Sequence, residues 1–298
     1  MKRFSAWAAV ALALSLVSTA MAPAAWAQTR GDPFGGRFGI IEVARSPREA
    51  LHQAKLMQSA LEGLAPQRPG RQDVYLLTAA FWGEPVFESE ASQGAARLTE
   101  RLGARGRSVI LSMGDGGLAD SQYPEATPDN VLAALGRIGE LIDPNEDLVV
   151  VFLTSHGAPD GSIVIQEAGR SRGVLRPAHL RDAFADAGIR NRVVIVSSCF
   201  SGAFIAPLVS DSTIVLTAAA HNRSSFGCQP QREWTYFGDA FFAESWGSGV
   251  SMLDAFDRAK TLIGEWERRD NLTPPSNPQA YVGARARDML ARAERDAR

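Results

Sequence analysis

The stretch VVIVSSCFSGAF (193–204) begins as an apolar run of strand length and places Cys199 directly after it. The stretch LVVVFLTSHGAPDGSIVI (148–165) repeats this arrangement with His156 and Gly157. Continuous apolar runs bounded by small and polar residues predict strands that are buried on both faces of a sheet. In α/β proteins, ligands bind beyond the carboxyl ends of such strands. The two stretches therefore place a thiol and an imidazole where this class of fold carries its chemistry.

Short apolar runs alternate with amphipathic segments along most of the chain. This alternation predicts an α/β fold with a mostly parallel sheet that helices cover on both faces. The expected strands are 74–80, 108–113, 148–154, 193–198 and 213–218, and the expected helices are 46–64, 89–103, 128–142, 177–187 and 250–268.

The two ends of the chain have their own patterns. Residues 1–27 resemble an export signal, with a basic start, the apolar run WAAVALALSLVSTAMA and a small-x-small cleavage site before Gln28. We therefore expect a periplasmic or secreted protein with no stable membrane insertion after cleavage. Residues 284–298 are rich in Arg and Ala and predict a terminal helix (284–296), which is either docked on the body or a solvated tail.

Composition excludes several classes of function. The chain has 298 residues, a formal net charge of −2 and no basic cluster, so nucleic acid is not an expected partner. Two cysteines and four histidines at irregular positions give almost no support for a zinc site. In an oxidising compartment, however, Cys199 and Cys228 could form a disulfide, which is the main rival explanation for Cys199.

Cys199 and His156 suit nucleophilic catalysis. A thiol becomes a strong nucleophile when a nearby base or positive charge favours the thiolate, and an imidazole can take a proton and return it to a leaving amine. The backbone N–H groups of Gly157 and Cys199 are candidates to bind the oxyanion of a tetrahedral intermediate. The alternative is a structural histidine and a buried or bridged cysteine.

Further stretches resemble the legumain-type cysteine peptidases (the C13 family), relatives of the caspases, and in particular exported bacterial members. Besides the His-Gly and Cys blocks, these stretches are YPEATPDNVLAAL (123–135), TAAAHNRSSFGC (217–228) and TYFGDAFFAESW (235–246). The matches keep the family's order and similar spacing over residues 72–265.

The resemblance implies a caspase-like three-layer α/β sandwich and cleavage of peptide bonds without metal or organic cofactor. By the same resemblance, Cys199 is the nucleophile, His156 is the general acid and base, and Gly157 with Cys199 binds the oxyanion. Transfer of the acyl group to an amine, as a transpeptidase or ligase, stays open. So does a catalytically silent module that binds peptides.

The substrate pocket is where the chain departs from the family. Legumains recognise asparagine or aspartate with an early arginine and a later aspartate; Asp239 and Ser225 match pocket positions, but WGEPVFESEAS (82–92) contains neither the arginine nor the family's asparagine near the histidine. A pocket with Asp239 and Glu88 or Glu90 would favour lysine or arginine instead. Replacement of the arginine by Arg223 is another alternative, so specificity stays open.

The expected domain boundaries follow from the residues that the family resemblance covers. We expect an N-terminal extension with one helix at 28–70, which is either a pro-segment or a packing element, followed by the peptidase domain at 71–283. The resemblance also implies that Cys228 lies beside the active site without bridging the nucleophile. Nothing in the sequence predicts the oligomeric state.

Overall fold

The computed structural model describes residues 46–114, 121–167 and 171–297, all within one compact unit, Arg45–Arg298. The expected signal segment 1–27 lies outside the described residues, as does the first part of the expected extension, 28–45.

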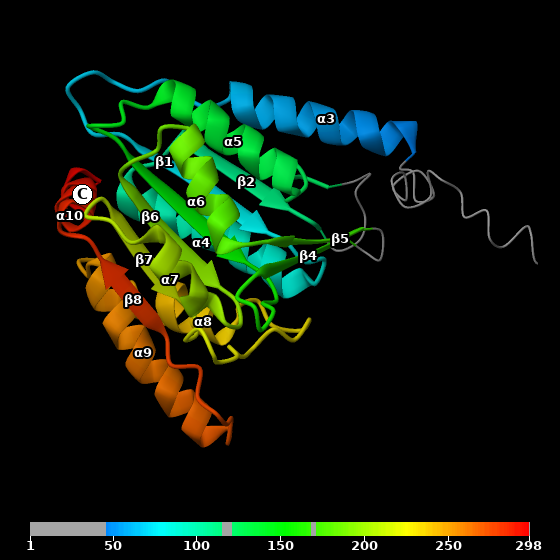
Figure 1. The fold of residues 1–298 in the computed structure, drawn as a ribbon, viewed down its shortest axis with the longest axis vertical. Coiled ribbons are helices and arrows are strands. Elements are labelled where there is room, and N and C mark those ends of the chain that lie inside the picture. Colours follow the sequence, from blue (N-terminus) through cyan, green and yellow to red (C-terminus); the bar gives the residue numbers. More distant parts are fainter. Residues whose placement is uncertain (1–45, 115–120, 168–170, 298) are drawn as a thin grey trace, which may run out of the picture. The chain divides into compact units, whose positions relative to one another are not determined.

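A six-stranded sheet lies at the centre of the molecule, in the order β2-β1-β3-β6-β7-β8 (Figure 1). Its first five strands are parallel, and β8 pairs with β7 in the antiparallel direction. This arrangement confirms the predicted α/β class with a mostly parallel sheet. The strands are β1 (Val74–Ala80), β2 (Ser108–Ser112), β3 (Leu148–Thr154), β6 (Arg192–Ser197), β7 (Thr213–Thr217) and β8 (Gln279–Val282).

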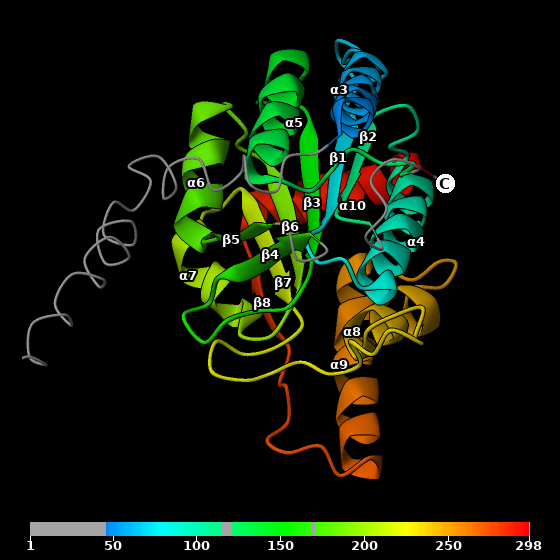
Figure 2. The same cartoon turned by 90° about the vertical axis from the view of Figure 1, so that its right-hand side faces the viewer.

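Helices cover both faces of the sheet and complete three layers (Figure 2). One face carries α3 (Pro47–Glu62), α5 (Pro128–Leu141), α6 (Pro177–Asp186) and α7 (Ile205–Leu208), with the short 3₁₀ helix η1 (Ser201–Phe204) before α7. The other face carries α4 (Pro85–Leu102), α8 (Tyr236–Gly238), the π-helical segment η2 (Asp239–Ser245), α9 (Met252–Arg269) and α10 (Ala284–Asp296).

The two-faced cover explains why the strands are apolar throughout. In β3, Val149 and Val151 pack into the core under α5 and α6, whereas Val150 and Phe152 pack into the core under α4 and η2. Successive side chains of a strand point to opposite faces, so both sets must be apolar when both faces are covered.

Several elements escaped the sequence analysis, among them the short helical segments η1, α7, α8 and η2. An antiparallel hairpin, β4 (Ile163–Glu167) and β5 (Ser171–Leu175), follows β3, and β8 forms one edge of the main sheet. The sequence QAYV of β8 is only partly buried, so it lacks the apolar run that marked the other strands. Helix α4 also begins at Pro85, four residues before its predicted start.

Both terminal helices dock on this body. Met57 and Leu61 of α3 pack against the core that includes α5, and Met289 and Leu290 of α10 lie in the core of the opposite face. The helix of the N-terminal extension is therefore packed into the same unit as the sheet, and the C-terminal helix is docked rather than a solvated tail.

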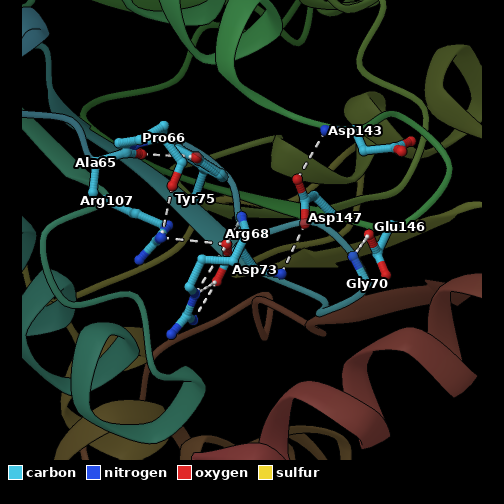
Figure 3. A network of polar contacts seen from close by, with 10 residues as sticks. All are labelled: Ala65, Pro66, Arg68, Gly70, Asp73, Tyr75, Arg107, Asp143, Glu146 and Asp147. Carbon is cyan, nitrogen blue, oxygen red and sulfur yellow. Dashed lines mark hydrogen bonds and ion pairs between the residues drawn. The ribbon is translucent and has the colours of Figure 1, made fainter.

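A polar network holds the amino ends of β1 and β3, away from the edge with Cys199 (Figure 3). The Asp73 carboxylate is almost fully buried and pairs with Arg68 and, at 3.3 Å, with Arg107. The Asp73 N–H donates to Asp147 at 2.7 Å. Tyr75 donates to the Ala65 carbonyl at 2.8 Å, so the network also ties the extension to the sheet.

Removal of the central carboxylate should destabilise the fold. We expect Asp73→Ala to lower the free energy of unfolding by about 3 kcal/mol, because it leaves the buried Arg107 guanidinium without its charge partner. Urea denaturation measures this, with Asp182→Ala as control, since that residue belongs to an exposed ion pair with Arg181. Equal losses below about 0.5 kcal/mol in both variants would contradict the assigned role.

Candidate active site

His156 and Cys199 follow neighbouring parallel strands. In the register of β3 and β6, Thr154 lies opposite Ser197, and each candidate comes two residues after its member of this pair. The Ser155 N–H donates to the Ser197 carbonyl at 3.2 Å, which extends the pairing beyond the strands. His156 and Cys199 therefore follow neighbouring strands at the carboxyl ends of the parallel sheet, which is the sheet edge that carries the candidate site.

The main chains of Gly157 and Cys199 are in direct contact. A Cβ atom on Gly157 would lie 1.9 Å from the Cys199 carbonyl oxygen and 3.1 Å from its nitrogen, so only glycine fits here. Neither N–H has a hydrogen-bond acceptor among the residues that the structure describes. The structure thus brings together the two groups that sequence analysis named as oxyanion donors.

The turn after Cys199 has an uncommon backbone conformation. Phe200 has a φ of 58°, in the left-handed region that few residues other than glycine adopt. Its N–H donates to the Arg223 carbonyl at 2.7 Å, and this bond helps to hold the turn against the loop after β7. Strain of this kind often occurs at functional sites, where the surrounding structure maintains it.

The Cys199 thiol faces Ser225. The Ser225 N–H donates to the sulfur at 3.3 Å, and the Ser225 hydroxyl lies 3.7 Å from it. The thiol in turn donates to the Ser225 carbonyl at 3.6 Å, so both polar backbone groups of Ser225 contact the sulfur. Ser225 therefore contacts the nucleophile candidate itself, at the position where the family resemblance expects a pocket serine.

The second cysteine lies near the first. Cys199 and Cys228 are both free thiols in the structure. Burial raises the pKa of Cys228, and the charge of Cys199 raises it further. Cys228 packs beside Val86 and Phe87 of α4, so it is a partly buried apolar side chain on the wall of the site.

Aromatic rings and one carboxylate surround the His156 imidazole. Trp82 and Phe87 meet it edge to face, with ring centroids 4.8 Å and 5.0 Å away. Glu84 Oε2 lies 3.4 Å from His156 Nε2, and about a third of each side chain is exposed. Glu84 was not among the residues predicted from the sequence. It lies in the segment 82–92, called the early loop from here on, which follows β1 of the same sheet, and this position was a signal.

Glu90 is enclosed beneath the site. Thr154 donates to one carboxylate oxygen, and Thr235 and Ser197 donate to the other at 2.6 Å and 3.2 Å. The Gly238 N–H donates to the Thr235 hydroxyl at 3.1 Å, and a Cβ on Gly238 would lie 2.1 Å from the carboxylate. Burial raises the Glu90 pKa to about 7, although these hydrogen bonds oppose the shift.

Asp239 forms an ion pair that the sequence did not indicate. Arg232 donates to its carboxylate at 2.9 Å, and each side chain is about one-third exposed. Arg232 is further held by its Nε bond to the Trp234 carbonyl at 2.9 Å and by its position over the Tyr236 ring. Burial raises the pKa of Asp239, and Arg232 counteracts this effect. Asp239 also opens η2, and π-helical turns often occur at functional sites.

Glu88 lies apart from that pair. Its carboxylate accepts a hydrogen bond from Ser112 at 2.6 Å, at the end of β2. It is near Gly114, where the described chain breaks off before residue 115. Glu88 and Asp239 thus contact different parts of the structure, and a substrate-binding role for Glu88 stays a prediction.

Metal binding and membrane insertion each require a recognisable arrangement of residues. Within the described part of the chain, no group of three or more His, Cys, Asp or Glu side chains is arranged to hold a metal ion. None of the described helices is long and apolar enough to span a bilayer.

Glu90 should make stability depend on pH. The folded chain holds the Glu90 proton up to about pH 7, whereas the unfolded chain releases it near 4.5, so the stability linked to this group is full below 4.5 and falls as pH rises toward 7. We expect the difference in unfolding free energy between Glu90→Gln and the parent to change by about 3 kcal/mol over that range. Urea denaturation at pH 4.5, 6 and 8 measures it, and a constant difference would contradict the assignment.

Comparisons with known proteins bear on the family of the chain. No curated protein sequence matches the chain. Among solved structures, caspase-1 from Spodoptera frugiperda has a TM-score of 0.48 at 10% identity, over 74% of this chain and 89% of that one. A structure described as pro-sf-caspase-1 has a TM-score of 0.46 at 10% identity, over 73% and 91%. The model of the Peptidase C13 family matches residues 86–282, a segment that includes both His156 and Cys199. The chain therefore belongs to the peptidase C13 family of cysteine peptidases.

Proposed function

We propose that this chain is a cysteine endopeptidase with Cys199 as nucleophile and His156 as general acid and base. The contact between the main chains of Gly157 and Cys199 carries the proposal, because it sets the His-Gly turn directly against the Cys turn. The Ser225 N–H donates to the Cys199 sulfur and helps to fix its position. Both candidates are part-exposed, so a substrate can reach them.

Acylation begins when the Cys199 thiolate attacks the scissile carbonyl carbon, while His156 carries the proton that the thiol has lost. The carbonyl oxygen gains the negative charge, and the free N–H groups of Gly157 and Cys199 bind it. His156 then donates its proton to the leaving nitrogen as the C–N bond breaks. An amine leaves, and a thioester joins the substrate's acyl group to Cys199.

Deacylation uses the same groups in reverse roles. His156 removes a proton from a water molecule, which attacks the thioester carbonyl, and the same N–H groups bind the second oxyanion. The C–S bond breaks, the thiolate is restored with the imidazolium beside it, and the carboxylic acid leaves. An amine in place of the water would give a new peptide bond.

The Arg232–Asp239 pair favours an asparagine or aspartate before the scissile bond. Arg232 offers donors for the side-chain oxygen, and Asp239 offers an acceptor for the amide NH₂. A lysine would instead meet a carboxylate that is already neutralised by a guanidinium. Arg232, rather than Arg223, takes the place of the arginine that the early loop lacks.

Peptide cleavage tests the catalytic assignment. A fluorogenic library varied at the residue before the scissile bond should be turned over by the full chain under reducing conditions. Cys199→Ala should lower kcat/KM about a thousandfold or more, because the acyl-enzyme forms on this thiol. Cys228→Ala serves as the matched thiol control and should keep most of the activity.

The other outcomes identify the alternatives. Product joined to an added amine, with little hydrolysis, would indicate a transpeptidase. Equal turnover by Cys199→Ala and the parent would contradict the assignment of the nucleophile, and no turnover by either would support a silent peptide-binding module.

Specificity has its own test. Arg232→Ala should lower kcat/KM for asparagine substrates about 10- to 100-fold, since a charge-assisted hydrogen bond is lost, and should raise the relative rate with lysine. Arg137→Ala, in an i,i+3 pair on α5, is the control. An unchanged ratio of asparagine to lysine cleavage would show that Arg232 does not line the pocket.

A further inference from the structure

The imidazole of His156 has one charged neighbour whose role the proposed reaction leaves unassigned. Glu84 Oε2 lies 3.4 Å from His156 Nε2. This oxygen is buried and accepts no hydrogen bond from any residue that the structure describes. The other ring nitrogen, Nδ1, likewise has no hydrogen-bond partner within the described residues. One ring nitrogen therefore faces a carboxylate, and the other has no hydrogen-bond partner in the described part of the chain.

The position of Glu84 is not explained by its helix. It is the N-cap residue of α4, where Ser, Thr, Asp and Asn are preferred because their side chains bond the first helical N–H groups. The Glu84 side chain makes no such bond. Pro85 follows it and favours the extended backbone that Glu84 adopts. The carboxylate is thus free of a capping role and is directed at the histidine.

The hairpin strand β4 joins the two segments that carry this pair. The Gln166 N–H donates to the Phe81 carbonyl, and the Val164 N–H donates to the His156 carbonyl, both at 2.9 Å. The early loop and the His-Gly turn are therefore bonded to the same strand. Trp82 and Phe87, on either side of Glu84 in the chain, limit rotation of the imidazole.

We infer that Glu84 is the positioning residue of His156 and that it holds the Nε2 proton so that Nδ1 exchanges protons with the reacting groups. This inference rests on the proposed peptidase function and deepens it. A carboxylate at one ring nitrogen selects the tautomer of the neutral imidazole and fixes the orientation of the ring. Glu84 touches neither the scissile bond nor the nucleophile in this scheme and acts only through His156.

Other ionisable groups also act on this region. Burial raises the pKa of Cys228, and the charges of Cys199, Glu84 and Glu90 raise it further. The test must therefore isolate Glu84 and must leave the thiol of Cys199 out of the titration.

An NMR titration of the His156 imidazole in the full chain with Cys199→Ala meets both requirements. The His156 signal is assigned by its loss in a His156→Ala variant. We expect Glu84→Gln to lower the His156 pKa by about one unit, because the amide keeps the shape but not the charge. Glu84→Asp, which keeps the charge at a greater distance, should give an intermediate value. Glu100→Gln is the control, since Glu100 is an exposed carboxylate on the same helix.

Activity gives a second readout with Cys199 present. Glu84→Gln should lower kcat about tenfold with little change in KM, and should move the alkaline limb of the kcat/KM profile to lower pH by about one unit. A His156 pKa within 0.2 units of the parent's, or an equal shift in Glu100→Gln, would overturn the inference, as would an unchanged alkaline limb. The NMR titration needs no turnover, so failure of the peptidase proposal is distinguishable from failure of this one.

Discussion

A carboxylate enclosed beneath the sheet edge joins the three chain segments that form the candidate site. Glu90 accepts hydrogen bonds from Thr154 at the end of β3, from Ser197 at the end of β6, and from Thr235 before α8. A buried carboxyl group without partners costs several kcal/mol, so an arrangement that separates these segments is strongly disfavoured. Gly238 also packs closely against the Glu90 carboxylate. A residue larger than glycine at position 238 would therefore collide with it.

The spacing along the chain turns this structural constraint into a chemical one. His156 comes two residues after Thr154, Cys199 comes two residues after Ser197, and Asp239 comes four residues after Thr235. One buried side chain therefore links the segments that carry the His156 imidazole, the Cys199 thiol and the Asp239 carboxylate. The contact between Gly157 and Cys199 then brings two free N–H groups to the same place.

The large-scale architecture could be predicted from the sequence because it depends on local patterns. Apolar runs such as 148–154 are long and continuous, and their ends predicted the sheet edge where His156 and Cys199 lie. The strand Gln279–Val282 could not be found in this way, because it is a short, partly exposed edge strand that depends on β7 as its partner.

The finer parts of the site depend on contacts between distant segments, which no local pattern contains. The family resemblance led us to expect an arginine and an asparagine in the early loop, and residues 82–92 contain neither. In the structure the basic partner of Asp239 is Arg232, from a later loop, and the polar neighbour of His156 is the carboxylate of Glu84. Both contacts join residues that no local pattern connects, so only the fold could show them.

The central claim is that the sheet edge presents Cys199, and not Cys228, as a nucleophile to a peptide carbonyl. The most direct test is to react the full chain with a peptide that carries asparagine followed by an electrophilic ketone, and to locate the adduct by mass spectrometry. The account predicts one adduct, on Cys199, whose rate of formation falls sharply in His156→Ala. An adduct on Cys228 alone, or a rate at Cys199 that does not depend on His156, would contradict it.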